Sequence, residues 1–439
     1  MRRLLPIAAL AAACACASEP GPADTDASSP TSDASTAVAE SSSTGQSEAG
    51  PTADTGTEAT APVSETDTVG PNGCQGSSDC TDPSNPFCID EVCVACSFAT
   101  DPDITCAAAD PGAPLCVNNE CVQCSAEEAA ACDAATPVCD AQSNACVACD
   151  FHEQCQDIGR PACDIVTGAC FADDQLVNVD VDDDIGRNDP IQDAIDLIPP
   201  NGVRALYLSG TTDPSVELII DQGKRIAIIS SSPDISLRGF SGPTLTVRGA
   251  ETVAYLHRIV IRGNGDDVGI SVEASAALFA DSVQVVGNDG GGITLATGTT
   301  GQLRNCMVGA DVNTDAVSNA GTLDVVYTTL VGNFGSSTAL ACSGATTVRN
   351  SILVSRSTDA VNCPGADIAN SFEAQGGAYQ EAWFDLDGED LSLTVGGTDY
   401  TVFSEVAIWE DGDPPFDFEG HPRPATDGST DYAGADTIP

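Results

Sequence analysis

Oxygen-bearing side chains recur at one position of a repeating pattern in the second half of the chain. Asp266, Asp289 and Asn313 stand 23 and 24 residues apart, and Asp267 lies directly beside the first of them. Two carboxylates about 5 Å apart repel each other by roughly 3 kcal/mol near a protein surface. A calcium ion would remove that cost, because it accepts oxygen ligands in loose geometries. These four residues are therefore candidate calcium ligands, although Asn, Asp and Gly are also the residues that turns require.

The same acidic residues are the candidates for catalysis of glycan cleavage. Hydrolysis of a glycosidic bond uses two acidic side chains, and the Asp266-Asp267 pair resembles the Asp-Asp pair of polygalacturonases. The Gly-His-Gly and Arg-Ile-Lys motifs of that family are absent. A lyase would need a base beside calcium, and Arg258 and Arg262 lie on the same repeats. Exposed arginines are more often solvated surface than bases, so we favour a protein without catalytic activity.

Short strands with a period of about 23 residues position these side chains. Three series of residues keep this step. They are Ile270, Ile293, Val317, Leu340 and Val361; Tyr255, Phe279, Leu303, Val325, Val348 and Ile368; and Arg258, Ser282, Cys306, Thr328, Ser351 and Ser371. Three strands on one period predict a coil of parallel β-structure with one turn per repeat. About seven turns follow one another, and parallel crossovers nearly always run right-handed.

The alignment of the repeats also predicts one disulfide. Leu340 and Val361 share a coil position, so Cys342 and Cys363, each two residues later, must lie on neighbouring turns. Neighbouring strands place Cα atoms about 4.8 Å apart, which is within the range that a disulfide tolerates. Cys306 aligns with Ser282 and Thr328, so we expect a free thiol there.

The two ends of the coil need covers. Asp189 and Pro190 are typical of a helix start, and an apolar face follows up to Ile198. This helix would cover the first turn, because an open end of β-structure invites aggregation. At the other end, 391–395 and 400–403 flank two glycines, which predicts a hairpin that closes the coil.

Sixteen cysteines between Cys74 and Cys170 form four units of four. Such density in an exported chain indicates disulfides that replace an apolar core, with two bridges per unit and three open connectivities in each. Zinc is the alternative, since Cys-x-x-Cys is a ligand spacing. We disfavour zinc because each such pair straddles two units. The array resembles small cysteine-rich repeats of bacterial surface proteins with the pattern Cys…Pro-x-Cys…Cys, as in Pro114-Leu115-Cys116.

The first residues are typical of an export signal, with Arg2 and Arg3 followed by a short apolar run. The segment that ends at Cys14 resembles a bacterial lipobox, and this resemblance implies that Cys14 is acylated after cleavage. Cys16 is the second candidate, and a plain secretion signal is the alternative. The acidic Ser/Thr/Ala/Pro-rich stretch that follows cannot bury enough apolar surface to fold, which predicts a disordered tether.

Most of the second half resembles the right-handed parallel β-helix of the pectate-lyase-like group. Asn305, Asn350 and Asn370 fall at one coil position, like the internal asparagine ladder of that fold. The tail, from Gly420-His421-Pro422-Arg423-Pro424 to Asp431-Tyr432-Ala433-Gly434-Ala435-Asp436, is similar to the closing motif of bacterial surface β-helix proteins. The resemblance implies an all-β fold and leaves the activity open.

The chain therefore divides into five predicted parts. They are a signal peptide (1–13), a tether (14–73), a four-unit disulfide array (74–173), a β-helix (176–376) and a closing segment (377–439). A net charge of −51 excludes nucleic acid as a partner. We expect a lipoprotein on the outer membrane or cell surface, touching the membrane only through its lipid, with no cofactor except a candidate calcium ion. Its expected role is non-catalytic adhesion or binding, to a glycan or another surface protein. The alternatives are a uronate-polymer lyase or hydrolase, a structural envelope protein, and a secreted form.

Overall fold

A computed structural model describes residues 73–437 with gaps at 76, 81–84, 86, 126–131, 157–159, 161, 184–188, 212, 231–234, 264, 266, 311–312, 333–335, 357–358, 379–382, 385–390 and 394–399. The predicted signal peptide, the tether, Cys14, Cys16 and Asp266 lie outside the described residues. None of the helices in the described part is long and apolar enough to cross a membrane.

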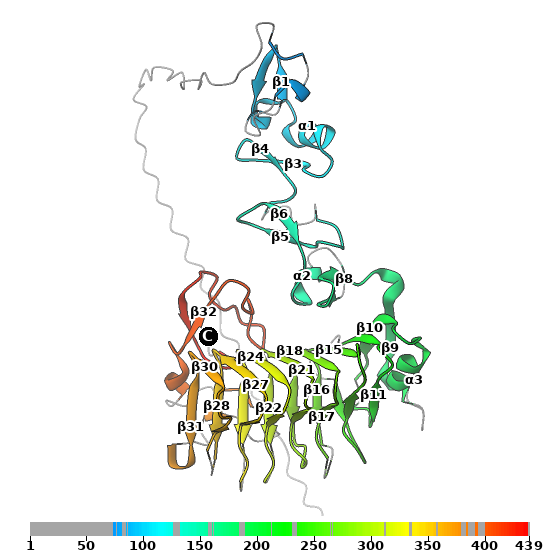
Figure 1. Ribbon diagram of the computed structural model, residues 1–439, viewed down its shortest axis with the longest axis vertical. Coiled ribbons are helices and arrows are strands. Elements are labelled where there is room, and N and C mark those ends of the chain that lie inside the picture. The colour runs from blue at the N-terminus through cyan, green and yellow to red at the C-terminus, as the bar shows by residue number, and fades with distance from the viewer. Residues whose placement is uncertain are drawn as a thin grey trace, which may run out of the picture. The chain divides into compact units, whose positions relative to one another are not determined.

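Parallel strands wind into a right-handed β-solenoid whose three sheets run along its length (Figure 1). The first sheet has nine strands, in the spatial order β9 (Leu176–Asp180), β10 (Val203–Ser209), β12 (Arg225–Ser230), β15 (Val253–His257), β18 (Ala277–Asp281), β21 (Thr300–Arg304), β24 (Thr322–Val326), β27 (Ala345–Arg349) and β30 (Asp367–Ala369). The second has seven, β11 (Leu218–Ile220), β14 (Leu245–Val247), β17 (Ile270–Val272), β20 (Ile293–Leu295), β23 (Val317–Asn319), β26 (Leu340–Cys342) and β29 (Val361–Asn362). The third also has seven, β13 (Ser236–Arg238), β16 (Val260–Arg262), β19 (Gln284–Val286), β22 (Met307–Ala310), β25 (Thr329–Gly332), β28 (Ile352–Ser355) and β31 (Phe372–Gln375). The fold class and the number of about seven turns agree with the prediction.

The interior of the coil is a continuous apolar stack. In the second sheet Ile270 pairs with Ile293, Ile293 with Val317, and Val317 with Leu340, as the period predicts. These side chains belong to one buried cluster that runs through the coils. Each coil buries its apolar face only against its neighbours, so the repeats stabilise one another.

The predicted register is wrong by one residue in two coils of the first sheet. Leu303 pairs with Ala280, and Ala280 with Leu256, so Tyr255 and Phe279 are not the inward residues. A slip of one residue moves a side chain to the other face of a sheet. Tyr255 and Phe279 point outward, and both belong to an apolar cluster on the outer face. The sequence lacks a clear alternation here because both faces of β15 are buried.

Helix α3 (Pro190–Leu197) covers the N-terminal end of the coil, as predicted. The Asp189 carboxylate accepts hydrogen bonds from the backbone N–H groups of Ile191 and Gln192. Ile191 and Ile195 are fully buried in the interior cluster of the coil. The short 3₁₀ segments η4 (Asp173–Gln175) and η5 (Val181–Asp183) flank β9.

The cysteine-rich region consists of four similar units, each built on a small antiparallel hairpin. The hairpins are β1 (Phe87–Ile89) with β2 (Val92–Val94), β3 (Leu115–Val117) with β4 (Glu120–Val122), β5 (Val138–Asp140) with β6 (Ala145–Val147), and β7 (Cys163–Asp164) with β8 (Ala169–Cys170). Short helical segments precede some of the hairpins, namely η1 (Ser77–Asp79), η2 (Cys96–Phe98), α1 (Pro102–Ala109) and α2 (Glu153–Gln156).

The disulfides follow one connectivity in all four units. The first cysteine joins the third and the second joins the fourth. The pairs are Cys74–Cys88, Cys80–Cys93, Cys96–Cys116, Cys106–Cys121, Cys124–Cys139, Cys132–Cys146, Cys149–Cys163 and Cys155–Cys170. All sixteen cysteines are therefore oxidised, which leaves no thiolate for zinc. Two bridges per unit agree with the prediction.

The fourth unit packs on the outer face of the coil. Ala162 and Phe171 of the unit belong to the same buried cluster as Tyr255. The Tyr255 hydroxyl donates a 3.0 Å hydrogen bond to the Asp164 carboxylate, which also lies 3.2 Å from the Arg225 guanidinium. This contact explains why an aromatic residue, Tyr255, occupies an outward position of the strand that would be exposed to water without the fourth unit.

The C-terminal part packs on the side of the coil, and its described residues 400–403 do not form the second strand of the predicted hairpin. Residues 400–403, expected to form a strand, are the 3₁₀ helix η8 (Tyr400–Phe403), and η6 (Gly376–Ala378) precedes it. Leu393 forms an isolated bridge with Phe384. Both leucines of 391–393, with Phe403 and Trp383, pack in an apolar cluster with Val286 and Met307 of the third sheet. One hairpin forms later, between β32 (Ala407–Trp409) and β33 (Ser429–Asp431).

Cys342 and Cys363 form the disulfide that the coil alignment predicts, with Cα atoms 4.5 Å apart. Cys306 is free and buried. It lies between Val283 and Thr328 on the neighbouring coils, so the predicted neighbour Ser282 is one residue off. Burial raises the pKa of the Cys306 thiol to about 12, which keeps it protonated and unreactive at neutral pH.

Candidate functional site

The structure describes three of the four predicted calcium ligands, and their backbones form the turns that lead into the second sheet. The Asp289 N–H donates to the Gly265 carbonyl, and the Gly290 N–H donates to the Asp267 carbonyl. Asn313 has a left-handed φ of 64°. Its side-chain oxygen accepts the Ser336 N–H at 3.1 Å, so this amide stabilises the next turn. A calcium ion at Asp266, Asp267, Asp289 and Asn313 remains a prediction.

The two catalytic candidates among the arginines lie at opposite ends of β16. Arg262 ends the strand, and its Nε donates a 2.8 Å hydrogen bond to the Ser236 hydroxyl. Arg258 precedes the strand and is exposed, with a left-handed φ of 54° at the corner between the first and third sheets. The structure therefore gives Arg262 a structural partner and leaves Arg258 on an open surface.

Arg258 borders an open polar hollow on the outer face of the corner. Residues of three coils and of the C-terminal segment line this hollow, which we call the corner hollow. They are Arg258, Asp281, Ser282, Arg304, Asn305, Pro414, Pro415, Phe416 and Asp417. Phe416 is 48% exposed. The corner hollow thus combines cationic, anionic and amide groups with an aromatic ring that water can reach.

Arg304 and Asp281 are the least exposed charged pair that lines the corner hollow. They end β21 and β18, face each other across the sheet, and approach to 3.9 Å. The Arg304 guanidinium also stacks on the Phe151 ring of the fourth cysteine-rich unit, with its central carbon 4.1 Å from the ring centre. Arg304 is only 11% exposed, and its Nε has no hydrogen-bond partner among the described residues. Cation–π stacking holds the guanidinium in place and compensates part of its desolvation.

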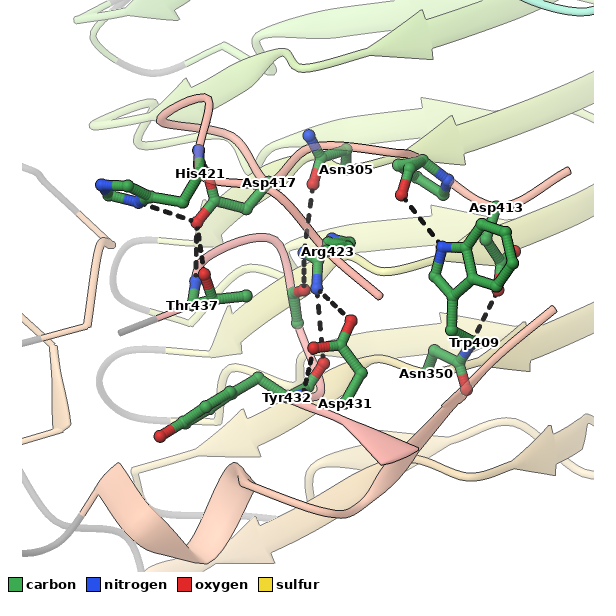
Figure 2. Close-up of polar contacts among 12 residues, drawn as sticks. Asn305, Asn350, Trp409, Asp413, Asp417, His421, Arg423, Asp431, Tyr432 and Thr437 are labelled. Atoms are coloured by element: carbon green, nitrogen blue, oxygen red, sulfur yellow. Dashed lines mark hydrogen bonds and ion pairs between the residues drawn. The ribbon is translucent and has the colours of Figure 1, made fainter. Parts of the chain in front are cut away.

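Asn305 and Asn350 do not form an internal ladder with each other. They share the left-handed corner position with Asn370, but Tyr327 occupies the coil between Asn305 and Asn350. The Asn305 amide donates to the Phe416 carbonyl at 3.3 Å. Asn350 donates to the Ile408 carbonyl and accepts the Ile408 N–H. The two amides therefore attach the C-terminal segment to the side of the coil. Figure 2 shows both asparagines together with residues of this segment.

Arg423 is the centre of this attachment (Figure 2). It is 5% exposed, and its guanidinium lies 3.0 Å from the Asp431 carboxylate and 4.0 Å from the centre of the Tyr327 ring. It also donates to the Asn305 side chain and to the Gly434 carbonyl at 2.8 Å. A buried charge is tolerated when it is paired and hydrogen-bonded, and Arg423 meets both conditions.

A second ion pair, between a half-buried arginine and a buried carboxylate, lies one corner position further along the coil. The Arg349 guanidinium binds the Asp413 carboxylate through two nitrogens. Asp413 also accepts the Asn350 amide at 3.2 Å and the Glu410 N–H at 2.9 Å. We call the set Asn305, Asn350, Arg349, Asp413, Arg423 and Asp431 the clasp.

A third polar group lies beside the clasp. The Asp417 carboxylate accepts hydrogen bonds from the Thr437 N–H at 3.0 Å and the Thr437 hydroxyl at 2.7 Å. Its Oδ2 lies 3.1 Å from His421 Nδ1 (Figure 2). Asp436 lies within 4.8 Å of both of these residues.

The sequence reasoning missed the clasp as a site, although it noted the tail motif for its similarity. Arg423 and Asp431 belong to that motif, but Asn305 lies 118 residues before Arg423, and Tyr327 is also far from it in the sequence. The sequence did contain one signal. Arg423 is the last basic residue of a very acidic C-terminal segment, which predicts an ion pair between Arg423 and one of the carboxylates of that segment.

Two buried histidines mark the contact between the fourth unit and the coil. His152 accepts the Cys163 N–H at its Nδ1, and its ring lies 5.3 Å from the His257 ring, centre to centre. Burial, and secondarily the nearby His257, lowers the pKa of His152 well below its usual value. Burial also lowers the pKa of His257, against the opposing effect of Asp281. Both rings are neutral at pH 7, which suits packing and not acid catalysis.

Comparison with known proteins adds little to this picture. A sequence family described as "Family of unknown function (DUF8331)" matches residues 58–176. No curated protein matches the chain. Two structures of the pectin methylesterase from Aspergillus niger, in deglycosylated and penultimately deglycosylated forms, are similar at 14% identity. Each match covers 53% of this chain and 94% of the fungal chain, with a TM-score of 0.32.

The described residues define a disulfide-rich parallel β-solenoid protein. Nine disulfides among them indicate an extracellular or otherwise oxidising environment.

Proposed function

We propose that the protein is an exported, lipid-anchored surface protein that binds a glycan without cleaving it, with the corner hollow as its binding site. One observation supports this above the others. The corner hollow places an exposed arginine, a fixed arginine–aspartate pair and an amide around a partly exposed Phe416 ring. Sugar recognition uses this mixture, in which an aromatic ring packs on the apolar face of a sugar and polar groups bind its hydroxyls.

The charges favour a sugar that carries a carboxylate. Arg258 is exposed and free to turn toward a ligand, whereas Arg304 is held by Phe151 and Asp281. A guanidinium binds a carboxylate through two parallel hydrogen bonds, which are stronger than those between neutral groups. We therefore expect oligosaccharides that contain uronic acid to bind more tightly than neutral ones of the same length.

Calorimetric titration of the full chain with a panel of uronate and neutral oligosaccharides tests the proposal. Arg258→Ala should weaken uronate binding by about tenfold, the usual cost of one charged hydrogen-bonding partner. Arg248→Ala is the matched control, because Arg248 is also exposed on the coil and lies 3.4 Å from Asp221. Binding to no member of the panel, or equal loss in both variants, would contradict the proposal.

The enzyme alternative was assigned from the sequence to Asp266, Asp267, Arg258 and Arg262, and of these Arg258 lines the corner hollow. Asp281 and Asp417 both line it, as two carboxylates that a hydrolase would need. Both carboxylates already have structural partners, Thr437 for Asp417 and Arg304 for Asp281, which disfavours a role as acid or base in hydrolysis. Release of new reducing ends or unsaturated uronate from the same polymers, abolished by Asp281→Asn, would replace the binding proposal by the enzymatic one. A protein that neither binds nor cleaves them would be a structural part of the envelope.

The anchor is a separate part of the proposal. Radiolabelled palmitate should enter the protein in a bacterial host, and Cys14→Ser should abolish the label. Label that persists in this variant and disappears in Cys16→Ser would move the anchor to Cys16. No label in the unaltered protein would make it a secreted protein.

A further inference from the structure

The group beside the clasp is built by two distant parts of the tail. Asp417 and His421 flank a tight turn in which the Asp417 N–H donates to the His421 carbonyl and Phe416 bridges to Pro422. Asp436 lies near the end of the chain, between Ala435 and Thr437. One ligand atom from each of Asp417, His421 and Asp436 lies within 4.8 Å of the other two.

Asp417 and His421 are close enough to bind one metal ion together, and the ion would replace the hydrogen bond between Asp417 Oδ2 and His421 Nδ1. Their Oδ2 and Nδ1 atoms are 3.1 Å apart. Ligands at about 2.0–2.2 Å from a metal ion, at an angle near 90°, are separated by about 3 Å. Asp417 is also held in place by surrounding donors, since the His421 N–H binds its other oxygen at 2.7 Å and Thr437 binds Oδ2 twice. Such outer contacts orient metal ligands in known sites.

The Asp436 carboxylate supplies the independent sign of a ligand. Asp436 is 3% exposed, and its Oδ2 accepts the Leu393 N–H at 2.7 Å. Its Oδ1 is buried and has no hydrogen-bond partner among the described residues. A buried carboxylate oxygen without a donor is expensive and calls for an explanation, such as an ion.

The surroundings of Asp436 make a positive partner more necessary. Asp436 is buried, and the negative charges of Glu419 and Asp417 act on its carboxylate. Glu419 is exposed, and its carboxylate lies 3.9 Å from His421 Nδ1. Arg423, the nearest arginine along the chain, is already bound to Asp431 and to backbone carbonyls. The missing positive charge is therefore not supplied by the guanidinium of Arg423.

We propose that Asp417, His421 and Asp436 bind one divalent transition-metal ion, of the Zn²⁺ or Mn²⁺ class, with Glu419 as a further ligand from the solvent side. Calcium and magnesium prefer oxygen-only sites, whereas an imidazole nitrogen with carboxylates suits zinc, manganese and cobalt. This site differs in place and in chemistry from the acidic turns at Asp267 and Asp289. It does not depend on glycan binding.

The ion would fasten the segment around Asp436 to the turn of Asp417. Asp436 and Thr437 directly follow Ala435, which packs in the apolar cluster under the C-terminal segment and whose N–H binds Thr329 of the coil. An ion shared by Asp436 and the turn of Asp417 would hold this last stretch on the coil. Metal binding then becomes part of the stability of the whole segment.

Titration of metal-stripped full-length protein at pH 7.5 with Zn²⁺, Mn²⁺ and Co²⁺, followed by calorimetry, tests the proposal. We expect one ion per chain, a higher melting temperature for the C-terminal segment, and visible absorption of bound Co²⁺ that reports a nitrogen ligand. Asp436→Asn and His421→Gln should each weaken binding at least tenfold. Asp427→Asn is the control, because Asp427 is an exposed acid of the same tail and its substitution makes the same charge change. It should bind like the unaltered protein.

Two results would overturn the proposal. One is the absence of saturable uptake, or uptake that is unchanged in both ligand variants. The other is that Asp436→Asn raises the melting temperature of the metal-stripped protein while metal ions shift the melting temperature of neither protein, because a proton would then be the partner of Asp436. Cobalt absorption is read directly on the folded protein, so it separates loss of the site from loss of the fold. Glycan titration of the same variants keeps this test distinct from that of the corner hollow.

Discussion

Each cysteine-rich unit holds two disulfides around a very small apolar interior, whereas the coil holds a continuous apolar interior and, in its described part, one disulfide. The buried cluster at the start of the array consists of Phe87, Cys96 and Cys106 with a few partly buried neighbours. The cluster of the coil instead runs from Val179 to Leu353. Both regions are made of repeats, but the repeats of the array are closed individually and those of the coil are closed by their neighbours.

The two regions therefore differ in the source of their stability. A disulfide acts mainly by restricting the unfolded chain, and it contributes about 2–4 kcal/mol for loops of this size. The loops in the array span 13 to 20 residues. Stability there depends on redox conditions and belongs to each unit separately. In the coil it depends on packing between adjacent turns, so one damaged turn weakens the next.

Reduction of the disulfides should produce the largest difference between the array and the coil. Dithiothreitol under native conditions should unfold the array, because its units cannot fold on so small a core. The coil should stay folded, although its Cys342–Cys363 bridge also opens. Hydrogen exchange read by mass spectrometry should show lost protection in 87–156 and retained protection in β17, β20 and β23. Loss of protection in both regions at once would mean that the coil depends on the array.

A cavity in the apolar interior should destabilise the coil and leave the array unaffected. Ile293 is 1% exposed and stacks between Ile270 and Val317. Ile293→Ala should lower the free energy of unfolding of the coil by about 2–5 kcal/mol, as large-to-small core changes do. Denaturant unfolding measures this loss, and the disulfide pairs of the array should be unaffected. Thr294→Ala on the exposed face of the same strand is the control, with an expected change of less than about 0.5 kcal/mol.

Mild acid should have a smaller effect, at the contact between the two regions. The pKa of buried His152 lies well below 6.5, so the folded protein binds fewer protons than the unfolded chain when the pH falls below about 6.5. Stability is therefore full above that pH and falls by about 1.4 kcal/mol per pH unit for each such histidine. The titratable or charged groups near the ring include His257, Tyr255, Asp150, Asp281 and Arg304.

His152→Asn sharpens this prediction, since an amide oxygen can still accept the Cys163 N–H but does not titrate. The slope of stability against pH between 6.5 and 5 should decrease by about one proton in this variant. Denaturant unfolding at several pH values measures the slope. An unchanged slope would show that His152 is already accessible to protons in the folded state.

The fold was predictable because most coils bury a regular inward series. Where that regularity is disturbed, the prediction fails for a physical reason. Tyr255 and Phe279 were placed in one series with Leu303 because they lie at the expected spacing. They are outward residues that the fourth cysteine-rich unit covers. Sequence spacing alone does not reveal which apolar residue is buried by another region.

The candidate site was harder to predict than the fold. The stacked acids were found from the coil period, but the Asn313 side chain is bound to the Ser336 N–H in the turn of the next coil. The clasp joins residues such as Asn305 and Arg423 that are far apart in sequence, and no local pattern encodes their contact. The prediction of a tail hairpin was wrong for residues 400–403, because they form a helical turn whose Phe403 is buried against the side of the coil.

The clasp has a mechanical consequence. A solenoid that is pulled at its last turn can peel one turn at a time, because each turn is held only by its neighbour. Here one segment bonds to Asn305 in one turn and to Asn350 two turns further on. A load on the last turns would have to shear this segment along the coil, breaking several contacts together before the first turn could detach. A protein exposed to flow or to a tugging partner would gain resistance from such a lateral strap.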